Sequence, residues 1–273
     1  VEAYLNDESI EIERIKDTQN DKLVQIKLIF TMSAFTKCFR PISNYPSDFA
    51  DLAVWLRADS GVTFNIPTKR VSDWGDGSGN SNDVVQATVA NQPLRNGYDG
   101  QNDKSYFSFD GINDFMTSSN NSPITTDFTI FEVSRIDAVS NNVFGWNNGA
   151  ASISIGTDAN GYVSTTVNDG VTSISTNTSV VNTLSSHIGV LKKHNKRIDL
   201  EYYDSANSIT TTDNDAAFDN TFLFNTATFD IGSLNTSNFL NGQLQEVIVY
   251  NRALSTTEIA DIRGYLNLKY KIY

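Results

Sequence analysis

Residues 239–270, FLNGQLQEVIVYNRALSTTEIADIRGYLNLKY, carry the two patterns that decide the fold. The segment LQEVIVYN (244–251) has the composition of a β-strand. Ser255 followed by Glu258 has the spacing of a helix capping box. Apolar side chains then recur at helical intervals on one face, at Ile259, Ile262, Leu266 and Tyr270. The stretch therefore predicts a strand followed by a C-terminal helix that lies against the sheet as a strap.

The strand pattern extends through the rest of the chain. In LVQIKLIF (23–30), apolar residues occupy every second position, so they share one face of a strand. Similar segments, separated by turns rich in Gly, Asn and Asp, are 9–15, 105–110, 128–136, 151–156, 162–167, 187–193, 197–204 and 228–233. Many short strands with frequent turns are typical of a β-sandwich. We therefore expect an all-β fold of two antiparallel sheets with one short C-terminal helix.

Two prolines in PISNYPSDF (41–49) interrupt the strand pattern and predict a domain boundary. The boundary separates a small β-rich N-terminal arm, residues 1–45, from a domain at residues 46–273. A segment as short as this arm is too small to form a robust core alone. We expect it to pair with the main domain or with a neighbouring subunit, as an anchoring or assembly segment.

Composition excludes several classes of function. The net charge of −12 would repel nucleic acid and anionic lipid, so nucleic acid is not an expected partner. Cys38 is the single cysteine, so an intrachain disulfide and a thiolate zinc site are both excluded. Two histidines, His187 and His194, make His-based triads hard to assemble. No apolar stretch approaches the roughly 20 residues of a membrane span, so membrane insertion is not expected.

The stretch WGDGSGNSNDVVQ (74–86) allows two interpretations. As a structural turn, its glycines permit left-handed backbone that Asp and Asn side chains stabilise by local hydrogen bonds. As a cation or glycan loop, Asp76, Asn80 and Asp83 would supply the oxygen ligands that Ca²⁺ prefers. Calcium is the one candidate cofactor, although the loop lacks the spacing of an EF-hand.

Several segments together resemble a LamG-like jelly-roll domain of the laminin G and concanavalin A-like lectin/glucanase superfamily. The resemblance covers residues 46–273 and is carried by LAVWLRADSGV (52–62), VSDWGDGSGNSNDVVQ (71–86), QPL (92–94), YFSFDGINDFM (106–116) and the 239–270 stretch. It implies that the sandwich is a jelly roll, and it assigns Glu246 to the family's strand pattern.

The resemblance also raises the question of catalysis, because the superfamily includes β-glucan hydrolases. In hydrolases of this kind, a strand reading E-x-D-x-E places its acids on one face. The nearest segment here is DLEYY (199–203), where Asp199, Glu201 and Tyr203 share a face and tyrosine replaces the third carboxylate. Retaining glycosidases need two paired carboxyl groups. We therefore expect no enzymatic activity, with a glycoside hydrolase as the alternative.

Glycan binding is the favoured function, because a jelly roll offers a concave sheet on which aromatic rings can stack against sugars. The candidate stacking residues are Trp146, Tyr162, Tyr202 and Tyr203. Each is also compatible with an ordinary place in the core or on the surface.

The setting that we expect is a surface-displayed, lectin-like module. If Val1 is the mature residue, the chain carries no export signal, which favours a phage virion surface (capsid decoration, tail or fibre) over a secreted or cell-surface bacterial adhesin. The expected partners are glycans or cell-surface polysaccharide, and proteins of a larger assembly that bind residues 1–45. A homo-oligomer is compatible with this arrangement.

Overall fold

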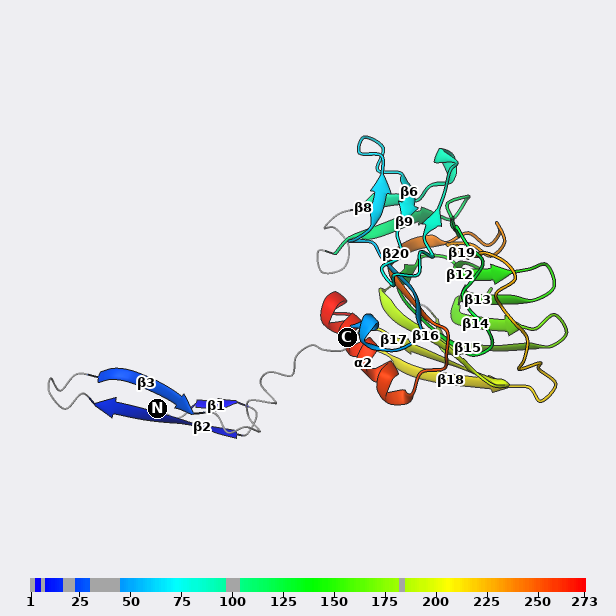
Figure 1. Cartoon of the computed structure of the whole chain (residues 1–273). Helices are drawn as coiled ribbons and strands as arrows, with labels where there is room; N and C mark the ends of the chain where they lie inside the picture. The colour runs from blue at the N-terminus through cyan, green and yellow to red at the C-terminus, as the bar shows by residue number, and fades with distance from the viewer. Residues whose placement is uncertain (1–2, 6–7, 17–22, 30–44, 97–103, 182–184) are drawn as a thin grey trace. The chain divides into compact units, whose positions relative to one another are not determined.

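The computed structural model describes residues 3–5, 8–16, 23–29, 45–96, 104–181 and 185–273, which fall into two compact units, Val1–Ser43 and Asn44–Tyr273 (Figure 1). In the first unit, β1 (Ala3–Leu5), β2 (Glu8–Lys16) and β3 (Leu23–Ile29) form an antiparallel sheet in that order. The strand expected at 9–15 is therefore present, and the strand expected at 23–30 is present over its described residues, 23–29. Cys38 and the first proline of the expected boundary lie outside the described residues.

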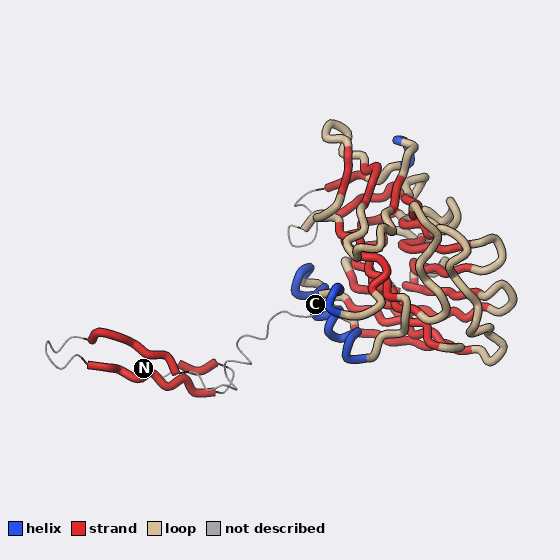
Figure 2. The backbone as a smooth tube through the Cα atoms, viewed as in Figure 1, coloured by secondary structure: helices blue, strands red, loops and turns tan. Residues whose placement is uncertain are grey.

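The second unit is a sandwich of two antiparallel sheets, as expected (Figures 1 and 2). Within the described residues, one sheet has nine strands in the order β15 (Ser173–Val181), β14 (Tyr162–Asn168), β13 (Ser152–Thr157), β12 (Asn142–Asn147), β19 (Phe229–Ile231), β10 (Met116–Ser118), β7 (Val84–Val85), β6 (Val71–Trp74) and β5 (Val62–Phe64). The described part of the other sheet has eight, in the order β18 (Ser208–Asn214), β17 (Arg197–Tyr203), β16 (His187–His194), β11 (Phe128–Ile136), β20 (Asn241–Tyr250), β9 (Tyr106–Asp110) and β8 (Leu94–Asn96), with β4 (Leu52–Arg57) also paired to β20. Two short 3₁₀ turns, η1 (Pro46–Asp48) and η2 (Val89–Asn91), complete the connections.

The main hydrophobic core lies between the two sheets. Aromatic rings from both sheets meet there: Trp74 of β6 packs against Phe107 of β9 with ring centroids 4.5 Å apart. Toward the other end, Trp146 of β12 packs edge-on against Phe224 at 5.2 Å. Burying such side chains is worth roughly 1.5–3 kcal/mol each, and this burial is what holds the sheets together.

Helix α2 (Thr256–Tyr270) covers the outer face of the eight-stranded sheet, where it forms a second hydrophobic cluster with β4, β11, β16 and β20 (Figure 2). The predicted capping box is confirmed: Ser255 Oγ accepts the Glu258 amide at 3.3 Å, and the Glu258 carboxylate accepts the Ser255 amide at 2.8 Å. The predicted apolar face is also confirmed, because Ile259, Ile262, Leu266 and Tyr270 are buried in this cluster, together with Tyr265. No helix among the described residues has the length and apolar character that crossing a membrane requires.

Glu246 of β20 lies beneath this helix with 0% of its surface exposed. Its carboxylate accepts hydrogen bonds from Trp55 Nε1 (2.7 Å), Tyr265 Oη (3.1 Å) and Tyr270 Oη (2.7 Å), and Lys269 Nζ lies 2.8 Å away. Glu246 therefore attaches the helix to the sheet. Its surroundings are those of a structural carboxylate.

The FDGIND segment (109–114), which begins in the last two residues of β9, forms a tight turn, and a glycine between Asp and Asn residues is typical of such a turn. The Asp110 carboxylate accepts the amides of Ile112 (2.9 Å) and Asn113 (3.2 Å). Gly111 has φ +73°, and a Cβ there would lie 2.7 Å from Asn241 Cβ, so the turn requires glycine at this position.

Candidate functional site

The loop at 74–86 brings the three predicted calcium ligands together and engages each in hydrogen bonds within the fold. The Asp76 carboxylate accepts the amides of Trp55 (2.8 Å), Ser78 (2.8 Å) and Asn82 (3.0 Å), and the Ser78 hydroxyl. Asp83 accepts the Asp76 amide at 2.7 Å. Asn80 Nδ2 donates to a carbonyl of β4. This is the geometry of the structural-turn interpretation, and the described residues contain no group of three or more His, Cys, Asp or Glu side chains that could hold a metal.

We expect Asp76→Ala to lower the free energy of unfolding by about 2–4 kcal/mol, because four donors lose one shared charged acceptor. Urea denaturation measures the change. A matched control is Asp73→Ala on the preceding strand, for which the structure shows no side-chain hydrogen bond and which should change stability by less than about 0.5 kcal/mol. Equal effects of the two substitutions would contradict the structural role of the loop.

The four predicted stacking residues do not form one site. Trp146 is 0% exposed in the core and its Nε1 donates to the Ala227 carbonyl, so neither ring face is available to a sugar. Tyr202 is 2% exposed, and its ring lies 4.8 Å from that of His187 inside the sandwich. Tyr162 is half-buried on β14 of the nine-stranded sheet. Tyr203, on the other sheet, lines a surface pocket.

We call this cavity the tyrosine pocket. It has a volume of about 310 Å³ and is formed by the end of β17, the turn into β18, helix α2 and the residues after this helix. The residues that line it are Tyr203, Asp204, Ala206, Asn207, Ser208, Arg263 and Tyr273. The two tyrosine rings have centroids 5.8 Å apart and are tilted by 39°. Tyr203 is 8% exposed and Tyr273 is 50% exposed, so the second ring presents the larger free surface.

Hydrogen bonds fix the acidic wall of the pocket. Asp204 accepts the Tyr202 hydroxyl at 2.7 Å, the amides of Ala206 and Asn207, and the Asn207 side-chain amide. Burial alone would raise the pKa of Asp204, but these donors outweigh burial and lower the pKa, so the carboxylate stays ionised near neutral pH. Tyr202 therefore acts on the pocket indirectly, by positioning Asp204.

The outer wall is formed by Arg263 and Tyr203. The Arg263 guanidinium lies 4.1 Å from the centroid of the Tyr203 ring, a cation–π arrangement. The Tyr203 hydroxyl donates to Glu201 Oε2 at 2.7 Å. Burial, and then the hydrogen bond to Glu201, raise the pKa of Tyr203 to about 12, so its hydroxyl remains a donor to this carboxylate.

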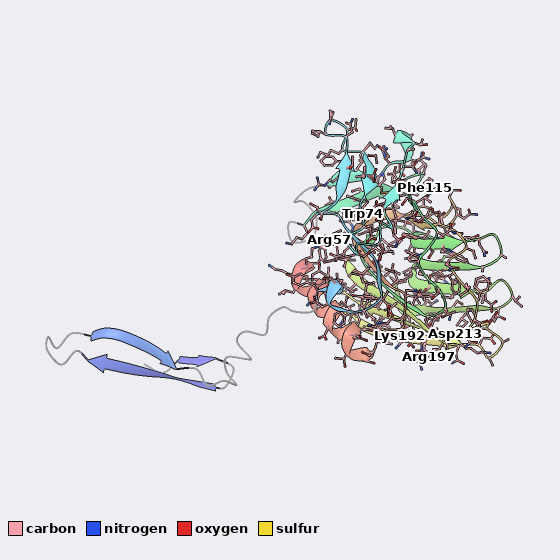
Figure 3. The ribbon with its side chains drawn as sticks, in the orientation of Figure 1. Arg57, Trp74, Phe115, Lys192, Arg197 and Asp213 are labelled. Atoms are coloured by element: carbon pink, nitrogen blue, oxygen red, sulfur yellow. The ribbon has the colours of Figure 1, made fainter. Side chains whose placement is uncertain are left out.

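The acids of the hydrolase alternative, Asp199 and Glu201, lie two positions apart on β17. Asp199 is engaged by Arg197 at 2.6 Å, by the Thr212 hydroxyl at 2.6 Å and more distantly by Lys192 at 3.9 Å. Figure 3 shows Lys192 and Arg197 close together, and both side chains contact Asp199 of β17. Each of the two acids is thus engaged by neighbouring side chains.

A second hollow lies on the outer face of the nine-stranded sheet, over β14 and β15. We call it the hydroxyl trough. It has a volume of about 400 Å³ and is lined by Asp158, Ser164, Thr165, Thr166, Ser175, Thr176 and Asn177. Asn177 Nδ2 donates to Asp158 at 3.0 Å across its rim. Because side chains alternate along β14, Tyr162 shares the face of Ser164 and Thr166.

The sequence did not point to Arg263, Asn207 or Tyr273. Docking of α2 onto the sheet brings Arg263 and Tyr273 to Tyr203, whereas Asn207 lies in the turn that joins β17 to β18. A lone arginine on the polar side of a helix is ordinarily solvated, and no spacing in the sequence distinguishes this one.

No family model matches the chain, and no curated protein is similar to it in sequence. Several solved structures share its fold. One is domain 4 of AbnA, a GH43 extracellular arabinanase from Geobacillus stearothermophilus in complex with arabinotriose, with a TM-score of 0.54 and 12% identity over 78% of this chain and 98% of that one. A GH54 α-L-arabinofuranosidase aligns with a TM-score of 0.56 and 12% identity over 83% of this chain and 60% of its own. A Trypanosoma rangeli sialidase aligns with a TM-score of 0.52 and 15% identity over 82% and 33%. The chain therefore spans only part of these two enzymes, and at such identities the likeness shows the fold.

Proposed function

We propose that residues 46–273 form a glycan-binding module and that the tyrosine pocket is its binding site. The observation that carries the proposal is the pairing of a half-exposed ring, Tyr273, with polar groups of Arg263 and Asn207 in one cavity of about 310 Å³. Sugars present an apolar face that stacks on aromatic rings and hydroxyls that bind fixed polar groups. The arabinanase domain of the same fold, solved with arabinotriose, supports the proposal by analogy.

The module that we propose is non-enzymatic. The support is geometric: Asp199 and Glu201 lie on one strand and are both engaged by neighbouring side chains, whereas glycoside hydrolysis needs two carboxyl groups that flank the scissile bond. The hydrolase alternative predicts sugar release from polysaccharides that Glu201→Gln abolishes. Absence of release across neutral and acidic polysaccharides would leave binding as the function.

Tyr273→Ala is expected to weaken glycan binding at least about tenfold, because it removes the exposed ring on which a sugar would stack. Stacking of a ligand ring on one aromatic side chain is worth on the order of 1–3 kcal/mol, as nucleic-acid bases show. A glycan array identifies the ligand, and isothermal titration measures its affinity. The control is Tyr162→Ala beside the hydroxyl trough, which should bind as the unsubstituted protein does. If Tyr162→Ala abolished binding and Tyr273→Ala did not, the trough would be the site.

Repeating the array in EDTA tests the calcium expectation for Asp76, Asn80 and Asp83.

We propose that the module is displayed on a virion surface, with a bacterial cell surface as the alternative, and that residues 1–45 attach it. The three-stranded sheet of the first unit supports this role, because short strands with free edges can add to a host sheet. The full chain should co-sediment with particles of its source, whereas residues 46–273 alone should stay folded and remain in the supernatant. Equal co-sedimentation of both would contradict attachment through the arm.

A further inference from the structure

Arg263 has hydrogen-bonding capacity beyond the hydrogen bond that it makes with the Tyr273 side chain. A guanidinium offers five N–H donors in one planar fork. The nearest carboxylate oxygen, Glu201 Oε2, is 3.8 Å away, which is beyond hydrogen-bond distance. The side chain is 27% exposed, and its guanidinium rests on the Tyr203 ring, so stacking orients the fork while its edge stays reachable from the pocket.

The acids around Arg263 are already engaged. Glu201 accepts the Tyr203 hydroxyl, and Asp204 accepts the Tyr202 hydroxyl together with backbone and side-chain amides of the 204–207 turn. A hydroxyl of a ligand therefore finds few free acceptors on this wall. A ligand acceptor, in contrast, finds the fork of Arg263 and the exposed hydroxyl of Ser208. The pocket therefore offers donors to a group that accepts hydrogen bonds, and Arg263, the one basic side chain among the described residues of its lining, favours a negatively charged group at the point of contact.

The overall charge of −12 opposes an anionic ligand, but it acts over a longer range than the contact itself. At physiological ionic strength the Debye length is about 8 Å, so exposed charges elsewhere on the domain are largely screened at the pocket. A guanidinium in direct contact with a carboxylate is screened much less, and its planar fork matches both oxygens. Two carboxylates lie at the pocket itself, Asp204 in the lining and Glu201 3.8 Å from Arg263, and both already accept hydrogen bonds. Direct contact with the guanidinium is therefore what favours an anionic ligand.

We propose that the tyrosine pocket selects sugars that carry a carboxylate, with Arg263 binding the carboxylate and Tyr273 stacking on the ring. This proposal rests on the glycan-binding function proposed above and names the chemical class of its ligand. It distinguishes sugar acids from the neutral sugars that have the same ring.

Two ligands that differ only at C6 test the proposal on the full chain: methyl β-D-glucuronide, which carries a carboxylate, and methyl β-D-glucoside, which carries a hydroxymethyl group. Titrations followed by amide NMR shifts of the pocket residues give both affinities. We expect the glucuronide to bind at least about tenfold more tightly. Arg263→Gln should reduce the glucuronide affinity to that of the glucoside and leave the glucoside unchanged. Arg197→Gln, a more exposed arginine outside the pocket lining, is the control and should change neither affinity.

The outcomes separate the two proposals. Equal affinities of the unsubstituted protein for both sugars would overturn selection for a carboxylate and leave glycan binding intact. A glucuronide preference that survives Arg263→Gln would overturn the role of Arg263. If neither sugar shifted the amide signals of the pocket residues in the unsubstituted protein, both proposals would be overturned. Should Arg263→Gln not fold, Arg263→Lys replaces it, because lysine keeps the charge and removes the planar fork. Comparing the two sugars on the unsubstituted protein and on Arg263→Lys then decides the result.

Discussion

Glu246→Ala is expected to lower the free energy of unfolding by about 3–5 kcal/mol, the largest effect of any single substitution proposed here. The carboxylate accepts hydrogen bonds from Trp55, Tyr265 and Tyr270 and pairs with Lys269, all beneath α2. Removing it leaves these buried donors without their acceptor, and each such group costs on the order of 1–3 kcal/mol. Lys269 retains Asp59 at 3.2 Å, so the three neutral donors carry most of the cost.

The tyrosines remain donors throughout the useful pH range. Burial, and then the negative charge of Glu246, raise the pKa of Tyr265 and that of Tyr270 well above the ordinary tyrosine value. Ionisation of these two hydroxyls should therefore not change the stability loss caused by Glu246→Ala between pH 6 and 9.

Urea denaturation measures the effect of Glu246→Ala, and limited proteolysis of α2 locates it. Glu246→Gln, which keeps one acceptor oxygen and loses the charge, should cost less than alanine. Gln243→Ala, at a half-buried position of the same strand, should change stability by less than about 0.5 kcal/mol. If Glu246→Ala cost no more than this control, the carboxylate would not be what attaches the helix.

The second large effect concerns a buried ion pair inside the sandwich. His187 Nε2 lies 3.0 Å from Glu132 Oε1, and both side chains are fully buried. Burial lowers the pKa of His187, but the charge of Glu132, the hydrogen bonds to Glu132 and to the Ser185 carbonyl, and the charge of Asp204 together outweigh burial, so the pKa is raised above the ordinary histidine value of 6.5. Room for the carboxylate comes from Gly189, where a Cβ would lie 2.1 Å from Glu132 Oε1.

The free energy of unfolding should therefore fall as the pH rises through the pKa of His187. The folded state holds the His187 proton more tightly than the unfolded state, so the contribution is fully present below pH 6.5. It is lost as the pH rises from 6.5 through the raised pKa of the folded state. Besides Glu132, the groups that face His187 are the Ser134 hydroxyl of β11, 3.4 Å from Nε2, the Ser185 carbonyl, and Tyr202 and Asp204 at the end of β17. Urea denaturation at half-unit pH steps measures the slope.

His187→Leu should remove that slope and cost about 3 kcal/mol at pH 6, because it leaves the Glu132 carboxylate buried without a cation. The double variant Glu132→Leu with His187→Leu should be more stable than His187→Leu alone, since neither charge then remains buried. A slope that persists in His187→Leu, or a double variant that is less stable than the single one, would show that the pair does not carry the effect.

Two of the strands that the sequence analysis did not identify, β18 and β12, show why the fold was only partly predictable. β18 (Ser208–Asn214) alternates exposed and half-buried residues, and its sequence SITTTDN has too few apolar side chains to mark a strand. β12 (Asn142–Asn147) is buried at almost every position, so its sequence NVFGWN has no alternation to detect. Pairing with neighbouring strands, which no local pattern reports, makes both of them strands.

The candidate site was less predictable than the fold. Tyr203 was identified from its residue type and proved to line the tyrosine pocket, whereas Trp146 and Tyr202 share that residue type and lie in the interior. An aromatic residue in a strand looks the same in sequence whether its ring faces a core or a cavity. The three loop residues Asp76, Asn80 and Asp83 do lie together, because they are close in the chain.

By itself, the sequence determined the all-β class, the C-terminal helix with its cap and buried face, and the turn at FDGIND. These features depend on residues a few positions apart, and periodicity reports such short-range relations directly. Only the tertiary structure decided that β11 is buried on both faces, that Glu246 lies beneath the helix, and that Arg263 and Tyr273 meet Tyr203. These relations join segments from distant parts of the chain, and they exist only after the helix and the two sheets have packed together.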